Sequence, residues 1–316
     1  MIVRSGQVES HRKDDGTETL HLSDAGGLRQ FGAYHQTLPP GTRSSQRHWH
    51  TCEDEFLYVL AGTASIIDDA GTHLLGPGDA ACWRHGDANG HHVHNLSNAP
   101  LVYLIVGTRV AQDICHYPDD GSRQINADTT WQLQSADGQT LRHGDLPPEL
   151  LNLRPRWGHS YDSAKPYPRI IRPAMVQTDK SSPGQQAHLG AYDALLYSDT
   201  AGLSQFGAFV ETLHPGARSS DRHWHEQEDE FLYMLSGEAT VIEDDGAHLI
   251  RPGDAACWPA AVANGHHVFN PSTTPCSYLI VGTRLPSDIV HYSEIDKLYV
   301  RENGVARRTR RDGSPI

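Results

Sequence analysis

The sequence has no long hydrophobic run. No apolar segment among its 316 residues approaches the ~18 residues that would predict a membrane-spanning helix. The first residues, MIVRSGQVESHRKDDGTE, contain no apolar stretch that could serve as a secretion signal. We therefore expect a chain with no membrane partner.

Cysteine is scarce, and its number is odd. The five residues do not form a recognisable disulfide framework; they are Cys52, Cys82, Cys115, Cys257 and Cys276. A protein without disulfides is at home in a reducing compartment, so we predict a cytoplasmic location.

Positive charge is also in short supply. Lysine and arginine total 26 against 39 acidic residues, which gives a net charge of −13. Binding to a nucleic-acid backbone needs a positive surface, so we expect no nucleic-acid partner. The arginines between 301 and 311 are the local exception, and a solvated tail or edge strand is the simpler interpretation of them.

Histidine, by contrast, is abundant, with 21 residues that fall disproportionately in two nearly identical blocks. GTRSSQRHWHTCEDEFLYVLAG returns as GARSSDRHWHEQEDEFLYMLSG, and each stretch is followed by PGDAACW and ANGHHV. The offset is 175 residues throughout, as in His48 and His223. The chain is therefore a tandem duplication of one folding unit.

Short apolar segments separated by Gly, Pro, Asp and Asn turns predict that each copy is rich in β-strands. The number of such segments favours a small barrel or a double-sheet sandwich. Prolines crowd the stretch after the first copy and disfavour both helix and central strand there. We predict domains at 1–145 and 172–316, each with a trailing hairpin, joined by an extended connector at 146–171.

The repeated histidines have the spacing of metal ligands. His48 and His50 lie two apart, which places them on one face of a strand, and Glu55 opens the next apolar segment. ANGHHV supplies a further histidine. Three imidazoles and a carboxylate suit Fe(II), Mn(II), Ni(II), Cu(II) or Zn(II), and an octahedral ion would keep two adjacent positions open. The second copy repeats the pattern with His223, His225 and Glu230.

These motifs resemble the two signatures of the cupin superfamily. The first runs from Gly41 through His48, His50 and Glu55 to Gly62, with one residue more after the opening glycine than is usual. The second is matched by Gly253, Pro259, His266 and Asn270 in one copy, and by Gly78, His91 and Asn95 in the other. Ala261 stands at the usual glycine, Arg84 at the usual proline, and two extra residues precede the histidine.

The extra residues leave two choices for the last ligand of each copy. His91 or His92, and likewise His266 or His267, could complete the set; the H-x-x-x-N spacing favours His91 and His266. The resemblance implies an all-β chain of two tandem cupin barrels (double-stranded β-helix, jelly-roll-like). One divalent transition metal per barrel would be held by His48, His50, Glu55 and His91, and by His223, His225, Glu230 and His266.

The resemblance also implies a function. We expect a mononuclear metal enzyme acting on a small molecule, first a dioxygenase with Fe(II). The alternatives are a metal-dependent isomerase, decarboxylase or lyase of a small sugar or acid, and a non-catalytic binding protein. Duplication would supply within one chain the barrel pairing that single-domain cupins achieve as dimers, and a homo-oligomer remains open.

Differences between the copies suggest a division of labour. The first copy has His35, Arg84 and His94 where the second has Val210, Pro259 and Phe269. On this basis we expect the first barrel to be the more polar and to hold the working site.

Overall fold

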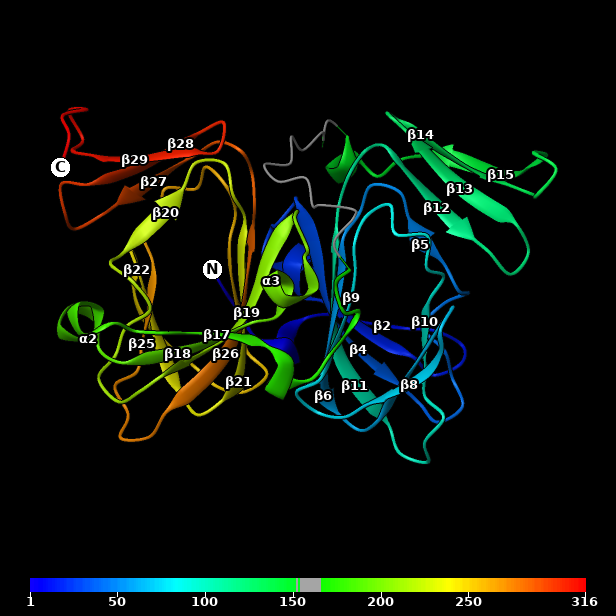
Figure 1. Ribbon diagram of the computed structural model, residues 1–316, viewed down its shortest axis with the longest axis horizontal. Coiled ribbons are helices and arrows are strands. Elements are labelled where there is room, and N and C mark those ends of the chain that lie inside the picture. Colours follow the sequence, from blue (N-terminus) through cyan, green and yellow to red (C-terminus); the bar gives the residue numbers. More distant parts are fainter. Residues whose placement is uncertain (152, 154–165) are drawn as a thin grey trace.

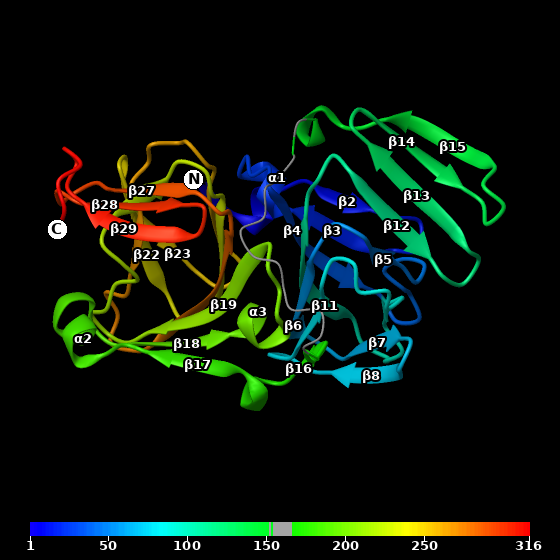
Figure 2. The same cartoon turned by 45° about the horizontal axis from the view of Figure 1, so that its top comes forward.

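Two β-rich lobes lie side by side in the computed structural model, the first copy in one lobe and the second in the other (Figures 1 and 2). The structure describes residues 1–151, 153 and 166–316. Part of the predicted connector 146–171 therefore lies outside the described residues.

Each lobe is built on a large antiparallel sheet of seven strands. In the first lobe its order is β16 (Ile170–Ile171), β9 (Ala80–Trp83), β6 (Glu55–Ala61), β11 (Leu101–Thr108), β4 (Phe31–Leu38), β3 (Glu18–His21) and β2 (Ser10–Arg12). In the second lobe the order is β1 (Ile2–Val3), β24 (Ala255–Trp258), β21 (Glu230–Ser236), β26 (Cys276–Thr283), β19 (Phe206–Leu213), β18 (Tyr192–Leu196) and β17 (Gln177–Lys180).

Two smaller sheets face the large sheet in each lobe. In the first lobe they are β10 (His92–His94), β7 (Ala64–Asp68) and β8 (Gly71–Leu75), and then β15 (Thr140–Asp145), β14 (Thr130–Gln134), β13 (Ser122–Ala127), β12 (Asp113–Tyr117) and β5 (Trp49–His50). In the second they are β23 (Gly246–Ile250), β22 (Ala239–Glu243) and β25 (His267–Phe269), and then β20 (His223–His225), β27 (Asp288–Tyr292), β28 (Leu298–Glu302) and β29 (Val305–Thr309).

Helices are short and peripheral to the sheets. The α-helices are α1 (Leu22–Ala25), α2 (Pro183–Leu189) and α3 (Tyr197–Ala201), and 3-10 turns occur at Ser5–Gln7, Pro148–Leu150 and Pro173–Met175. Helix α2 begins at a capping box, in which the Ser182 side chain and the Gln185 backbone N–H pair while Gln185 reaches back to Ser182. No helix among the described residues is long and apolar enough to cross a membrane.

The two copies exchange their first strands. β1 pairs with β24, so Ile2 lies opposite Ala256 of the second copy. In return, β16, at the end of the connector, pairs with β9, where Ile170 lies opposite Ala81 of the first copy. Each large sheet is thus completed by a strand that precedes the other copy in the chain.

The lobes share one hydrophobic core. A single buried cluster contains residues of both copies, and Phe31 and Phe206 meet in it with ring centroids 6.3 Å apart. Separate clusters fill each barrel, around Leu57 in the first and Leu232 in the second. Because burying this apolar surface stabilises the contact between the barrels, the two barrels form one folded unit rather than two independent domains.

Two buried aspartates lock the lobes together by reciprocal hydrogen bonds. Asp54 of the first copy accepts from the backbone N–H groups of Ser204 (2.8 Å) and Gln205 (2.9 Å). Asp229 of the second copy accepts from those of Arg29 (2.7 Å) and Gln30 (2.9 Å). Both carboxylates are almost fully buried, at 0% and 2% exposure, so their partners cannot be replaced by water.

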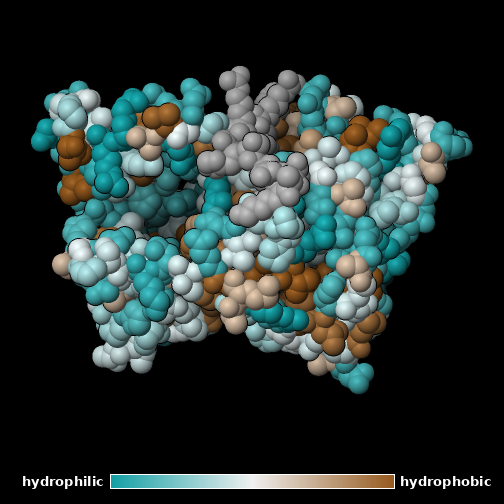
Figure 3. Space-filling model, in the orientation of Figure 1, coloured by the Kyte–Doolittle hydropathy of each residue, from teal (hydrophilic) through white to brown (hydrophobic). Residues whose placement is uncertain are grey.

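The predicted all-β fold with two tandem barrels is confirmed. Strands β14 and β15 flank the Asp137–Gly138 pair, and β28 and β29 flank Asn303–Gly304. The domain limits at 145 and 172 stay a prediction; neither interval contains every strand of its own large sheet, because β1 and β16 are exchanged. Figure 3 shows a hollow in the second lobe, surrounded by hydrophilic side chains.

Candidate metal centres

The candidate ligands of each copy lie where its two smaller sheets meet. His48 and His91 face each other in an isolated antiparallel bridge, and each backbone N–H donates to the other's carbonyl at 3.0 Å. His223 and His266 form the same bridge in the second copy. The backbone thereby fixes two imidazoles side by side before any ion is bound.

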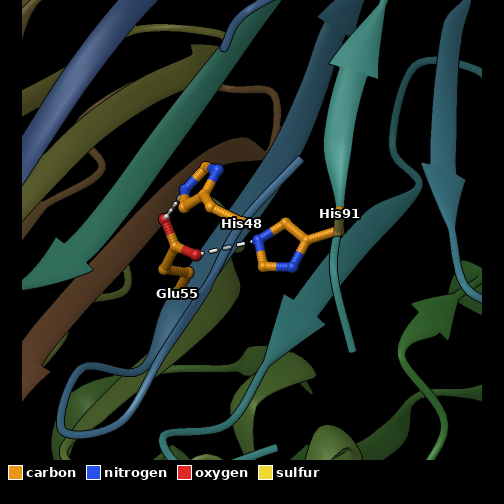
Figure 4. A group of neighbouring side chains, drawn as sticks. All are labelled: His48, Glu55 and His91. Atoms are coloured by element: carbon orange, nitrogen blue, oxygen red, sulfur yellow. Dashed lines mark hydrogen bonds and ion pairs between the residues drawn. The ribbon is translucent and has the colours of Figure 1, made fainter. Parts of the chain in front are cut away.

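Glu55 reaches this pair from the large sheet (Figure 4). Its carboxylate lies between the two rings, with Oε2 at 2.9 Å from His91 Nε2 and Oε1 at 3.9 Å from His48 Nε2. One ligand atom from each of these three residues lies within 4.8 Å of the others, a spacing that could hold one metal ion.

The second copy converges still more closely. Three histidine Nε2 atoms surround a single oxygen, Glu230 Oε2, at 2.9 Å for His266, 3.6 Å for His225 and 3.8 Å for His223. The four residues predicted from the sequence are therefore gathered around one point in this barrel.

The other nitrogen of each ring fits a metal-binding histidine. Nδ1 of His48 donates to the Gln46 carbonyl at 2.9 Å, and Nδ1 of His91 donates to the Asn89 carbonyl at 3.0 Å. The second copy repeats these contacts at Asp221 and Asn264. Because a carbonyl can only accept, Nδ1 carries a proton, and Nε2 on the glutamate side is the nitrogen that could bind a metal.

The remaining histidine of each set is oriented by a buried aspartate. Nδ1 of His50 lies 2.6 Å from Asp113 Oδ2, and Nδ1 of His225 lies 2.6 Å from Asp288 Oδ2. Each aspartate also accepts a backbone N–H with its other oxygen, from Cys52 at 2.8 Å and Gln227 at 3.0 Å. A carboxylate behind a ligating imidazole fixes the ring and raises its basicity.

His50 therefore differs from its predicted companions. Its Nδ1 lies in a second group of possible ligands, with Glu53 and Asp113, while His48, Glu55 and His91 form the first. The His50 ring nevertheless stands edge-on to that of His48, with centroids 5.3 Å apart.

Charge is strongly coupled within these sites. Burial alone would raise the pKa of Glu55, but hydrogen bonds from His48 and His91 hold it well below its usual range. Burial likewise opposes the charge of Glu230, and His225 and His266 lower the pKa of this carboxyl. Both glutamates are therefore ionised, so each site has a negatively charged carboxylate at its centre.

In the second copy, His225 carries the positive charge that balances Glu230. Burial lowers the pKa of His225, but Glu230 and Asp288 outweigh it and raise the value to about 9. Burial dominates at His223 and lowers its pKa to about 4. Without a metal, a proton thus sits on His225, and a bound cation would take its place.

A tryptophan supports the last histidine of each set. Trp83 stacks on His91 with centroids 3.8 Å apart, and Trp258 stacks on His266 at 4.0 Å. Trp49 and Trp224 face away from the sites, as the strand alternation predicts, and stack on His116 and His291 instead.

The structure brings His91 and His266, rather than His92 and His267, to the glutamates. Arg47 and Arg222 pair with acidic residues of distant segments rather than with those that directly precede Glu55 and Glu230. Arg47 reaches Asp69 and Asp119, and Arg222 reaches Asp244 and Glu294. Asp113 and Asp288 escaped the sequence analysis, although their 175-residue offset and their place in DICHY and DIVHY were available signals.

Three residues suggested a more polar first barrel, and all three lie outside the group formed by His48, Glu55 and His91. His35 is on the side of the shared core, with its ring 6.2 Å from that of Tyr233. Arg84 lies over the ring of Tyr167 at 4.9 Å, and His94 contacts the Gly41 carbonyl at 3.3 Å. They give no physical reason to prefer the first barrel.

A cavity of about 190 Å³ adjoins the metal group of the second copy. His223, Glu230 and His266 line one part of it, and Glu211 and Tyr278 line another. Its size and lining suit a small polar molecule held beside the ligands.

The family model of a cupin domain matches residues 34–107 and 209–282. The chain is 25% identical over 272 residues to oxalate decarboxylase OxdC of Bacillus subtilis strain 168, over 77% of this chain and 64% of the relative. The chain thus spans less than two thirds of this relative's length.

Two solved structures are also similar. The oxalate decarboxylase of Lactobacillus farciminis, in its formate complex, aligns with a TM-score of 0.56 at 16% identity, over 92% of this chain and 88% of that one. A cupin-superfamily sugar phosphate isomerase of Silicibacter pomeroyi aligns with a TM-score of 0.43 at 37% identity, over 45% of this chain and 93% of that one.

Proposed function

Because the chain belongs to the cupin superfamily and carries two of its domains, we propose that it is a metal-dependent enzyme that decarboxylates a small organic acid. The observation that carries the proposal is the convergence of three Nε2 atoms on Glu230 Oε2 beside a cavity of about 190 Å³. The similarity to a decarboxylase over 77% of this chain supports the choice of reaction.

The residues present fit a divalent transition metal. His48, His50, Glu55 and His91 would hold it in the first copy, and His223, His225, Glu230 and His266 in the second. A bound divalent ion supplies Lewis acidity toward a carboxylate or carbonyl oxygen. The carbonyl groups and aspartates behind the rings hold the Nδ1 side of each imidazole, so the Nε2 atoms are already oriented toward the ion.

The cavity determines the size of the substrate. It has room for an acid of few heavy atoms, and the hydroxyl groups of Ser219 and Ser220 in its lining can donate to a carboxylate. Trp258 and Ile280 close its apolar side, which excludes water from one face of a bound molecule.

Decarboxylation replaces dioxygenation as the first choice. The dioxygenase prediction rested on how common that activity is in the superfamily, and the relatives described above support the decarboxylase alternative instead. The preference for Fe(II) depended on dioxygenation and loses its support with it. A non-catalytic binding role stays an alternative prediction.

The test is a panel of small carboxylic acids, including oxalate and 2-oxo acids, given to protein loaded separately with Mn(II), Fe(II), Ni(II), Cu(II) or Zn(II). Release of CO₂ from at least one acid is the expected result, with no release by protein treated with a chelator. Oxygen uptake with catechols, thiols or diketones, and no CO₂ release, would restore the dioxygenase. Conversion of sugar phosphates would favour the isomerase alternative.

A further inference from the structure

The lining of the second-copy cavity can be compared with the first copy position by position. Eleven residues line the cavity: Glu211, Ser219, Ser220, His223, Glu230, Trp258, His266, His267, Val268, Tyr278 and Ile280. Subtracting 175 from each number gives the corresponding position of the first copy, and ten of the eleven hold the same residue. The exception is Glu211, whose counterpart is Gln36.

The two side chains have different partners on the neighbouring strand. Gln36 is held at both ends of its amide, because the Tyr103 hydroxyl donates to its Oε1 and its Nε2 donates to Thr19 Oγ1 at 3.2 Å. Thr19 lies directly opposite Gln36 in the ladder of β3 and β4. The amide of the first copy is therefore a closed structural link.

Glu211 is held at one end only. The Tyr278 hydroxyl donates to its Oε2 at 2.7 Å, but Ala194 stands opposite it, where the first copy has Thr19. Among the residues that the structure describes, no side chain or backbone group donates to Glu211 Oε1. Two positions have therefore changed together: Gln36 and Thr19 of the first copy correspond to Glu211 and Ala194 of the second. Without the threonine hydroxyl, Oε1 of Glu211 has no strand partner among the described residues, in a cavity that His223, Glu230 and His266 also line.

We propose that Glu211 is the proton donor of the second site, a role that rests on the decarboxylation proposed above. Loss of CO₂ breaks the bond between the carboxylate carbon and its neighbour, and the electron pair stays on that neighbour. A proton from the Glu211 carboxyl then forms the new C–H bond. Glu211 recovers a proton from solvent, so each turnover consumes one proton and needs no oxidant.

The surroundings of Glu211 favour the protonated form. Burial raises its pKa, the hydroxyl of Tyr278 lowers it, and the negative charges of Glu230 and Asp179 raise it further, with a raised pKa as the net result. Tyr192 of β18 is a further titratable group nearby, and burial and the negative charge of Glu211 both contribute to its raised pKa. The proton is therefore retained to a higher pH than on a free glutamate.

The first copy cannot perform this step. An amide has no proton to give at ordinary pH, and both ends of Gln36 are already engaged. The two copies thus share the candidate ligands, while a carboxyl group outside the ligand set occurs only in the second copy among the compared cavity-lining positions. The working site we infer is in the second barrel, contrary to the expectation from the sequence.

The test uses full-length, metal-loaded protein and the variant E211Q, alone and with A194T. The double variant recreates the Thr–Gln pair around which the first barrel already folds, so it controls for disturbance of the strand. We expect kcat to fall by about 100-fold or more with KM little changed, in the range of a lost general acid. Bound metal per chain should stay the same.

The pH profile separates a proton donor from a merely structural residue. Wild-type activity should fall as pH rises through the pKa of Glu211, and the residual activity of E211Q should lose this dependence. A kcat for E211Q within about threefold of wild type, with metal bound, would overturn the proposal, because a general acid contributes at least about 100-fold.

An infrared titration decides the matter without any reaction. In the metal-loaded protein, a protonated carboxyl band missing from E211Q should persist above pH ~4.3, the ordinary pKa of glutamate. Its absence above that pH would overturn the role of Glu211 even if the enzyme is active. If the band is present but no acid in the panel releases CO₂, the proposed decarboxylation is wrong. Glu211 would then still be the protonated acid of the second site, for a different reaction.

Discussion

The two copies agree where they would bind an ion and differ in what surrounds it. Both place an aspartate behind one histidine and a stacked tryptophan against another. Around this common centre, Arg301 contacts Glu228 in the second copy, and Asn126 occupies the position of Arg301 in the first. Burial raises the pKa of Glu53 to about 8, and that of Glu228, which Arg301 opposes, to about 7. Duplication has kept the candidate ligands and varied the charged residues around them.

The largest expected effect comes from removing a ligand in one copy at a time. H48A and H223A should each lower bound metal from two ions per chain to one, because each set is confined to its own barrel. If the proton donor is Glu211, H223A abolishes activity and H48A keeps most of it. Metal analysis and CO₂ release measure both effects, and equal loss of activity in the two variants would show that the copies act together.

The aspartate locks should be equally important in both copies. Removing the carboxylate of Asp54 or Asp229 leaves buried N–H groups of the other lobe unpaired, and we expect a loss of about 3–5 kcal/mol of unfolding free energy. Urea denaturation of D54A and D229A, with D14A as an exposed control, measures this. Loss in one variant only would mean that the lobes are held mainly from one side.

The aspartates behind the histidines should affect the metal rather than the fold. D113N and D288N keep the shape of the side chain but remove its charge, and we expect metal affinity to fall by about 10–100-fold in the affected barrel. Titration with a competing chelator measures the change. Unaltered affinity in both would contradict the orienting role of these residues.

Metal uptake should strengthen as pH rises. The raised pKa of about 9 means that His225 is protonated at neutral pH in the metal-free protein, and this proton must leave when the ion binds. Affinity at the second site should therefore increase by about tenfold per pH unit below pH ~9 and then level off. His50 has its pKa raised well above the usual value, with Asp113 overcoming burial, so the first site should share this slope. Proton release on metal addition, followed in weakly buffered solution, is an independent check.

The smallest effect concerns one turn that precedes the last ligand. Ala261 adopts a φ of 64°, and its counterpart Gly86 adopts 72°. A left-handed backbone costs a residue with a Cβ about 1 kcal/mol relative to glycine. A261G should therefore stabilise the protein by up to about 1 kcal/mol, and G86A should destabilise it by a similar amount. Thermal unfolding of the pair compares them directly.

The sequence predicts the barrels well, because turn residues and a repeated ligand pattern are local signals. It predicts the convergence of His223, Glu230 and His266 for the same reason. It does not predict the exchange of β1 and β16, since Ile2–Val3 and Ile170–Ile171 are too short to show which sheet they join. Glu211 was also missed: it becomes distinctive only when Ala194 is seen opposite it and the cavity is known.

The exchanged strands have a consequence for how such a chain can change over evolutionary time. Because Ile2–Val3 belongs to one sheet and Ile170–Ile171 to the other, the halves would stay clasped if the polypeptide between them were severed. A gene split at that point would still encode partners able to recognise each other. The covalent link therefore serves mainly to keep the two halves in equal number. The exchanged strands hold the halves together, so the side chains around each site can change independently.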